Sequence, residues 1–214
     1  MNHMAKTKFN RPIAFFDFDG TLTTKDTLMP FLKFVVGKPV YYIKLFAISP
    51  VLIAYFLKLI RNDVAKQLVL KWYLSGYSID ELFDLGNRFS QKIIPGILRT
   101  EGMERLRWHQ QQGHECILVS ASLDIYLESW VKMENINALL SSQLAVKKDC
   151  ITGKLKGGNC FGEQKVQRIL EWLNGRLPPF IYAYGNSKGD ESMLMFANEG
   201  FLFKKKQGFI KING

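Results

Sequence analysis

Two aspartates, Asp17 and Asp19, follow a short apolar run and stand just before Gly20 and Thr21. Gly20 lets the chain leave strand geometry at once, so that the two carboxylates can converge. Paired carboxylates suit Mg²⁺, which prefers oxygen ligands and keeps several of its waters. They also suit divided chemistry, in which one carboxylate is a nucleophile and the other transfers protons. The alternative is an ordinary turn that carries two solvated aspartates.

Three more polar clusters follow apolar runs or begin helical patterns. Residues 120–122, Ser-Ala-Ser, precede a predicted helix, where a hydroxyl and backbone N–H groups bind an anion unless the serine is only a helix cap. Lys165 begins another predicted helix and either reaches a phosphate or is a solvated surface lysine. Residues 185–191 offer oxygen ligands for a metal, or form a polar loop in which Asp190 caps the next helix.

Short apolar runs predict the strands that place these clusters. The runs lie at residues 13–16, 115–119 and 180–184, with a candidate fourth at 201–203. They show little alternation, which is typical of parallel strands buried on both faces. Helical patterns separate them, at residues 123–133, 163–173 and 190–197. This order predicts an α/β fold with a doubly wound parallel sheet, in which ligands bind beyond the carboxyl ends of the strands.

The interval between the first two strands has a different pattern. Residues 28–94 are mostly helical in pattern and contain no evident strand. Turn signals stand at residues 37–39, 49–50 and 75–78. Pro95-Gly96 marks the return to the sheet. We therefore expect a helical insertion between the first and second strands.

Composition sets limits on the class of protein. The chain has 214 residues, of which 47% are hydrophobic and 22% charged, which suits one core with a small accessory domain. The net charge of +10 favours anionic partners, namely phosphorylated metabolites, anionic lipids or nucleic acid. The positive charges are scattered and form no nucleic-acid motif, so no nucleic-acid partner is expected. Three unpaired cysteines and a polar N-terminus without an apolar segment predict a cytoplasmic protein.

The motifs resemble those of the haloacid dehalogenase superfamily of phosphohydrolases. Residues 15–23, FFDFDGTLT, are similar to its highly specific first motif, and residues 117–122, ILVSAS, to its second. Lys165 fits the single-residue third motif, and residues 184–190 fit the fourth. The resemblance covers residues 13–203. It implies a Rossmann-like core at residues 10–27 and 95–214, with an α-helical cap at residues 28–94.

Within the superfamily, the chain looks most like the phosphoserine-phosphatase-like branch. Residues 159–165 and 185–190 are similar to bacterial members of that branch, which include phosphatidylglycerophosphate phosphatases. Asp26 aligns with a position that is often glutamate in phosphoserine phosphatases and helps to bind the substrate amine. A shorter acid there weakens a phosphoserine assignment, and Asp26 is equally suited to cap the following helix.

The resemblance also implies roles for individual residues. Asp17 would attack phosphorus and become phosphorylated, whereas Asp19 would protonate the leaving alkoxide and then activate water. Phosphate oxygens would be held by Thr21, Ser120, the backbone N–H of Ala121, and Lys165. Mg²⁺ would be held by Asp17, Asp19, Asn186 and Asp190. The family usually has an acidic residue where Asn186 stands, so the expected change is in metal affinity rather than in reaction class.

Residues 40–60 bear on the choice of substrate. Leu45 to Leu57 carries no charge but is too short to span a membrane, and Ser49-Pro50 is expected to interrupt it. A helix pair buried against itself explains this segment. The other explanation is an interfacial hairpin that makes peripheral contact with the inner face of a membrane, which suits a lipid phosphate such as phosphatidylglycerophosphate.

Several functions therefore stay open. The chain is expected to be a phosphatase of a lipid phosphate or of a small soluble phosphomonoester, or a non-catalytic membrane- or anion-binding domain. Transfer of the phosphoryl group to an acceptor other than water uses the same intermediate. His109 and His114 are expected to be surface or loop residues without a role. The oligomeric state is not set by these patterns.

Overall fold

The computed structural model describes residues 10–213, so that the polar N-terminal segment and His3 lie outside it. Its centre is a seven-stranded sheet with the order β4-β3-β2-β1-β5-β6-β7. The strands are β1 (Ile13–Phe16), β2 (Glu115–Leu123), β3 (Ala138–Lys147), β4 (Cys150–Lys156), β5 (Ile181–Gly185), β6 (Glu199–Lys204) and β7 (Gly208–Asn213). Neighbouring strands are parallel except at the two edges, where β4 and β7 are antiparallel to their partners.

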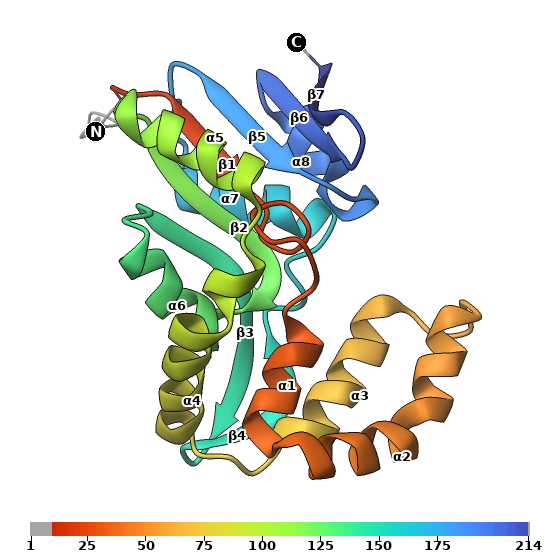
Figure 1. Cartoon of the computed structure of the whole chain (residues 1–214). Helices are drawn as coiled ribbons and strands as arrows, with labels where there is room; N and C mark the ends of the chain where they lie inside the picture. Colours follow the sequence, from red (N-terminus) through yellow and green to blue (C-terminus); the bar gives the residue numbers. More distant parts are fainter. Residues whose placement is uncertain (1–9, 214) are drawn as a thin grey trace, which may run out of the picture.

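Helices cover both faces of the sheet (Figure 1). They are α1 (Leu28–Val36), α2 (Lys38–Phe56), α3 (Asn62–Leu74), α4 (Ile79–Lys92), α5 (Thr100–Gln111), α6 (Asp124–Met133), α7 (Glu163–Leu173) and α8 (Glu191–Phe196), with 3₁₀ turns η1 (Ile94–Ile97) and η2 (Lys188–Asp190). The four runs predicted as strands are found as β1, β2, β5 and β6. The three predicted helices after residue 122 are found as α6, α7 and α8.

Strand β1 shows why its sequence is apolar throughout. All four of its residues are buried, because helices lie on both sides of the sheet. Ala14 and Phe16 join the core cluster that includes residues of α5 and α6, whereas Ile13 and Phe15 join the cluster with α7 and α8. Successive side chains therefore point to opposite faces, as the strand period requires.

The chain order of the strands reverses beside β1. From β1 the sheet continues through β2 and β3 in one direction, and then through β5 and β6 in the other. Parallel α/β sheets bind ligands at such a switch point, beyond the carboxyl ends of the strands. Asp17 directly follows β1, so it stands at this switch point.

Residues 28–94 are mostly helical, as predicted, and contain α1 to α4; η1 and α5 follow before β2. Helix α4 packs against α6, and α3 packs against β4, so the insertion is attached to the sheet at two places. Figure 1 shows α1, α2 and α3 extending to one side of the sheet. The division of the chain into a core and a separate cap stays a prediction.

Helix α2 corrects the expectation that Ser49-Pro50 interrupts this segment. It continues through Pro50 for 19 residues. Pro50 has no N–H for the carbonyl of Phe46, but the Ser49 hydroxyl donates to that carbonyl at 2.7 Å. The replacement hydrogen bond lets the helix continue. Of the described helices, α2 alone is long and apolar enough to cross a membrane by length and composition.

The outer side of α2 is exposed, which is a second correction. Phe46 is 83% exposed and Ile43 is 70% exposed. The helix does contact α1 and α3, but it buries only Tyr41 and Ile48 fully. A helix pair buried against itself therefore does not explain its composition.

Candidate active site

A cavity of about 820 Å³ opens at the carboxyl ends of β1, β2 and β5. The residues predicted from the sequence that line it are Asp17, Asp19, Asp26, Ser120, Ala121, Lys165, Asn186 and Asp190. Thr21 is fully buried behind Asp17 and does not line the cavity. The strand ends thus bring together side chains that lie up to 173 positions apart in the chain, since Asp17 and Asp190 both contact Lys165.

Lys165 lies between two carboxylates. Its amine is 2.6 Å from Asp17 Oδ1 and 2.7 Å from Asp190 Oδ1, and it also donates to the Val119 carbonyl at 2.9 Å. The lysine side chain is 1% exposed. It comes from the first turn of α7 and satisfies all three of its N–H donors in these contacts. The buried ion pairs therefore fix its position against Asp17.

The pKa values of this group follow from burial and from its charges. Burial and the Asp190 carboxylate raise the pKa of Asp17 to about 6, although Lys165 and Thr21 act in the opposite direction. Burial alone would lower the pKa of Lys165, but the two carboxylates raise it above the ordinary lysine value. Burial would raise the pKa of Asp190, but Lys165 and hydrogen bonds from residues 186–187 hold it below its ordinary value.

Thr21 and Asn186 complete the surroundings of Asp17. The Thr21 hydroxyl donates to Asp17 Oδ2 at 2.8 Å and lies 3.3 Å from Asn186 Oδ1. Gly20 makes this approach possible, because its φ is +80° and a Cβ there would lie 2.1 Å from Asn186 Nδ2. Asp190 holds the same loop, since its Oδ2 accepts hydrogen bonds from the N–H groups of Asn186 and Ser187.

Asp19 is held by hydroxyl groups that sequence analysis did not assign. Its Oδ1 accepts from Thr27 N at 3.0 Å and from Thr27 Oγ1 at 2.7 Å, and its Oδ2 accepts from the Ser122 hydroxyl. Tyr126 extends the network with a 3.0 Å contact to Thr27 Oγ1. Burial, and then the charge of Asp26, raise the pKa of Asp19 to about 7. The signal for Ser122 was its place in the Ser-Ala-Ser sequence, whereas Thr27 and Tyr126 gave none.

Ser120 and Ala121 lie at the end of β2, where the strand pairing with β3 becomes irregular. Ser120 is buried, and its hydroxyl accepts a hydrogen bond from Ser122 N at 3.0 Å. The Ala121 carbonyl accepts from the amine of Lys66. A regular strand would have paired the backbone polar groups here with β3. The irregular backbone leaves them free to face the cavity.

Asp26 lies both at the cavity and at the start of α1. It lines the cavity and is exposed. Its Oδ1 also accepts from Leu28 N at 2.9 Å, at the start of α1. The carboxylate therefore stabilises the helix N-terminus while it remains within reach of a ligand.

Lys66 and Asn159 are site residues that sequence analysis missed. The Lys66 amine crosses from α3 to Asn159 Oδ1 at 2.8 Å, and Asn159 Nδ2 donates to Asn62 Oδ1 at 3.2 Å. Asn159 is 8% exposed and also accepts from Ser142 Oγ at 3.0 Å. No local pattern marks Lys66, because its partners are distant in the chain.

The wall opposite the strand ends is largely apolar. It is lined by Leu28, Met29, Pro30, Leu52, Tyr55, Phe56, Ala65 and Val69, which belong to α1, α2 and α3. Phe56 is 78% exposed, so this wall continues into the exposed side of α2. The cavity thus has a charged end at the sheet and an apolar end at the inserted helices.

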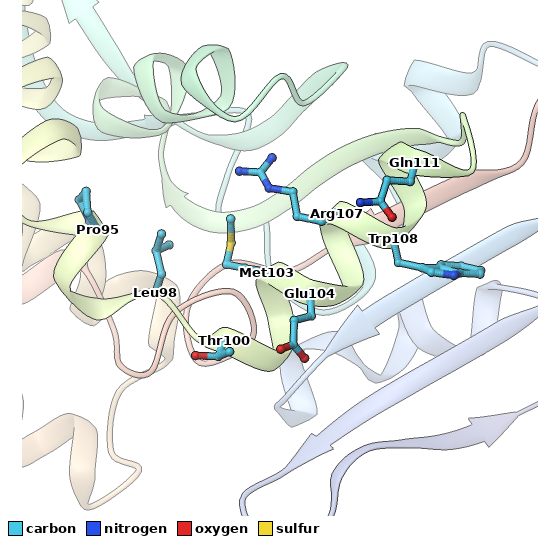
Figure 2. A pocket seen from close by; sticks show the side chains of 8 residues that line it. All are labelled: Pro95, Leu98, Thr100, Met103, Glu104, Arg107, Trp108 and Gln111. Atoms are coloured by element: carbon cyan, nitrogen blue, oxygen red, sulfur yellow. The ribbon is translucent and has the colours of Figure 1, made fainter.

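A second hollow, of about 620 Å³, lies along η1 and α5 (Figure 2). It contains none of the predicted site residues, and its Arg107 already pairs with Glu134.

His109, which belongs to α5, corrects a prediction, since it is fully buried rather than a surface residue. Its Nε2 lies 2.9 Å from the Tyr184 hydroxyl and its Nδ1 2.8 Å from His114 Nδ1. Burial lowers the pKa of His109 to about 3 and also lowers the pKa of His114.

Comparisons with known proteins agree with the motifs. The family model for haloacid dehalogenase-like hydrolases matches residues 14–195. Protein CicA of Caulobacter vibrioides is 31% identical over 185 residues, which make up 86% of this chain and 82% of CicA. A protein of unknown function from Bordetella pertussis Tohama I has a TM-score of 0.75 at 23% identity, over 86% of both chains.

A phosphoserine phosphatase, solved as a phospho-aspartyl intermediate analogue, has a TM-score of 0.56 at 18% identity, over 87% of this chain and 83% of that one. At these identities the two solved structures show a common fold, which is the predicted Rossmann-like α/β arrangement. The family model covers most of the chain, so it shows the family as well as the fold. The chain belongs to the haloacid dehalogenase-like hydrolases.

Proposed function

We propose that this hydrolase is a magnesium-dependent phosphomonoester phosphatase with Asp17 as its nucleophile. The observation that carries the proposal is the Asp17 carboxylate at the switch point, held by Lys165 at 2.6 Å and by Thr21 at 2.8 Å. An anionic nucleophile approaches an anionic phosphate only where cations offset the charge. The phospho-aspartyl form of the similar phosphoserine phosphatase supports a covalent route for this chain.

The reaction that we propose has two steps. An oxygen of Asp17 attacks phosphorus, the ester P–O bond breaks, and the Asp19 carboxyl gives its proton to the departing alkoxide. Asp19, now a carboxylate, takes a proton from water, whose oxygen attacks the aspartyl phosphate and releases inorganic phosphate. Ser120 and the N–H of Ala121 bind phosphate oxygens, while Lys165 offsets their charge. Thr27 and Ser122 hold Asp19 in place throughout.

The donor atoms near Asp17 fit Mg²⁺. Thr21 joins Asp17 Oδ2 to Asn186 Oδ1, and no residue among 10–213 donates a hydrogen bond to the Asp19 carbonyl. The Asp17 carboxylate, the Asn186 amide and the Asp19 carbonyl therefore supply oxygen ligands, as Mg²⁺ requires. Asp190 is engaged by Lys165 and residues 186–187, so we propose that it holds Asn186 in place for the metal. Bound Mg²⁺ would supply charge neutralisation for the phosphoryl group.

Hydrolysis of p-nitrophenyl phosphate tests the proposal. Wild type, Asp17→Asn and Asp84→Asn would be assayed with Mg²⁺ and with excess EDTA. Asp84 is an exposed aspartate of α4 and serves as the matched control. We expect wild type and Asp84→Asn to turn over the substrate with Mg²⁺ but not with EDTA. For Asp17→Asn with Mg²⁺ we expect the rate to fall on the order of 1,000-fold or more. Full activity of Asp17→Asn would refute the nucleophile assignment.

We further propose that the leaving group is a lipid, such as the phosphatidylglycerol part of phosphatidylglycerophosphate. The apolar end of the cavity supports this, because it continues into exposed side chains of α2. In this proposal residues 28–94 form a cap, of which α1, α2 and α3 cover the site. Acyl chains would leave the cavity along α2 while the phosphate stays at Asp17.

The same proposal gives α2 a peripheral place at the inner face of a cytoplasmic membrane. Its exposed aromatic and aliphatic residues suit the acyl boundary, and the net charge of +10 suits anionic headgroups. Sedimentation with phosphatidylglycerol vesicles and hydrolysis of a lipid phosphate in them test this. Failure of both would leave the alternative of a small soluble phosphomonoester, which the fold shared with phosphoserine phosphatase supports.

A further inference from the structure

Lys66 is a cation in the active-site cavity without a carboxylate partner. Its amine donates to the Ala121 carbonyl and, at 2.8 Å, to Asn159 Oδ1. Within the described part of the chain, no carboxylate oxygen lies at ion-pair distance from it. Lys165, the fully buried lysine of the cavity, contacts two carboxylates. The charge of Lys165 is thus compensated by two direct ion pairs, whereas Lys66 makes none within residues 10–213 and interacts with Asp19 and Asp26 only at longer range.

The surroundings of Lys66 leave room for an anion. An ammonium group has three N–H donors, and the two contacts of Lys66 use two of them. Burial lowers the pKa of Lys66 to about 8, although Asp19 and Asp26 act in the opposite direction. A desolvated cation without a counter-ion costs free energy, which a bound anion offsets.

The position of Lys66 is fixed from both sides of the cavity. Asn62 and Lys66 are four residues apart on α3 and therefore share a face of the helix. Both contact Asn159, which belongs to the segment before α7 and is itself held by Ser142. Lys66 thereby reaches Ala121, in the loop that we propose for phosphate binding, from the opposite wall.

We propose that Lys66 binds a second anionic group of the substrate, a phosphate or a carboxylate a few bonds from the scissile phosphoester. This inference rests on the proposed phosphatase function. The transferred phosphoryl group lies at Asp17, so the rest of the substrate extends toward the helices from which Lys66 reaches. Asn62 and Asn159 are positioning residues for its amine. A substrate with one phosphate alone would leave Lys66 without a direct ion pair.

Phosphonates test this inference without turnover, because their carbon–phosphorus bond is not hydrolysed. The probes are propylphosphonate, 3-phosphonopropionate and propane-1,3-diphosphonate, which differ in the group at the far end. Their dissociation constants would be measured by calorimetry with Mg²⁺ for wild type, Lys66→Met, Lys66→Arg and Lys71→Met. Lys71 is an exposed lysine of the same helix and is the matched control. Thermal unfolding checks that each variant is folded.

We expect wild type to bind at least one doubly anionic probe 10-fold to 100-fold more tightly, on the order of one charge-assisted hydrogen bond, than propylphosphonate. The preferred probe identifies the second group as carboxylate or phosphate. Lys66→Met should remove this preference, Lys66→Arg should keep part of it, and Lys71→Met should keep all of it. Equal binding of the three probes by wild type, or an unchanged preference in Lys66→Met, overturns the inference.

Hydrolysis of p-nitrophenyl phosphate by the same wild-type sample separates the two proposals. A wild type that hydrolyses this ester but binds the three phosphonates equally leaves the phosphatase proposal standing and removes the role of Lys66. A wild type that prefers a doubly anionic probe but hydrolyses no phosphomonoester supports Lys66 as an anion-binding residue and removes the phosphatase proposal.

Discussion

Asn186 brings an amide oxygen to a place where the motif usually supplies a carboxylate. Its Oδ1 lies 3.3 Å from the Thr21 hydroxyl that contacts Asp17, so it faces the proposed metal position. An amide ligates Mg²⁺ through the same kind of atom but adds no charge. If Asn186 ligates the proposed Mg²⁺, we expect it to change the affinity for the metal rather than the reaction.

Replacement of Asn186 by aspartate should strengthen metal binding. For Asn186→Asp we expect the Mg²⁺ concentration that gives half-maximal activity to fall on the order of 10-fold, because a charged ligand is added. Asn186→Ala should raise this concentration instead. The measurement is p-nitrophenyl phosphate hydrolysis over a Mg²⁺ titration. The same midpoint for all three proteins would show that residue 186 does not ligate the metal.

Asp124, the first residue of α6, makes stability depend on pH. Burial raises its pKa from 3.8 to about 6, with Glu128 adding to the shift and the Ile125 N–H and Arg168 opposing it. Between these values the folded protein holds a proton that the unfolded chain releases. The free energy of unfolding therefore decreases as the pH rises through this window.

Asp124→Asn should remove that loss, because asparagine has no charge to desolvate and can still accept from Ile125 N. Above pH 6 we expect the variant to be more stable than wild type by about 1–2 kcal/mol, which allows for the lost interaction with the helix dipole. The gap should close as the pH falls toward 4. Urea unfolding across this range measures it, and a gap that does not change with pH would contradict the explanation.

At the scale of elements, α2 has an exposed side that the fold itself does not use. Ile43 and Phe46 lie on this side, away from the two residues that the helix buries fully. We expect Ile43→Ser combined with Phe46→Ser to weaken binding to phosphatidylglycerol vesicles on the order of 10-fold or more, since each buried apolar side chain contributes about 1.5–3 kcal/mol. Hydrolysis of p-nitrophenyl phosphate should be retained.

Leu177→Ser is the matched control for that double variant. Leu177 is 80% exposed but lies between α7 and β5, outside the helical insertion. Its replacement should leave vesicle binding unchanged. If the control weakens binding as much as the α2 variant does, exposed apolar surface in general, rather than α2, accounts for the binding.

Strands marked by a continuous apolar run were predictable from the sequence, whereas strands that depend on pairing with a neighbouring strand were not. The strands β1, β2 and β5 are short apolar runs because both of their faces are buried. Strands β3 and β4 alternate and carry polar residues, and they are joined by Lys148 and Asp149, both with positive φ. Hairpin turns of this kind usually contain Asn-Gly or Asp-Gly, so the sequence lacked the usual signal.

The same distinction applies to the site. Asp17, Ser120 and Asp190 were predictable, because they lie near the carboxyl ends of β1, β2 and β5, and parallel strands bring such residues to one edge. Lys66 was not, because its contact with Ala121 spans 55 positions and depends on how α3 packs. His109 was misjudged because a polar helix pattern does not reveal the aromatic pocket around one of its residues.

At the scale of the whole molecule, the helical insertion and the sheet both contribute residues to the cavity. The sheet supplies the charged end of the cavity and the insertion supplies the apolar end. Their attachment is uneven, because α4 packs along α6 and α3 along β4, whereas α2 contacts only other helices of the insertion among its main partners. Figure 1 shows α2 at the far side of the insertion from the sheet.

This uneven attachment has a consequence for local opening of the fold. Helix α2 buries only two of its 19 residues, so its release exposes less apolar surface than its composition alone indicates. Its backbone amides should therefore exchange with deuterated water before those of α4, and without exposing the amides of the sheet. The proposed lipid substrate would then enter through transient fraying of one helix, while Asp17 and Asp19 keep their alignment.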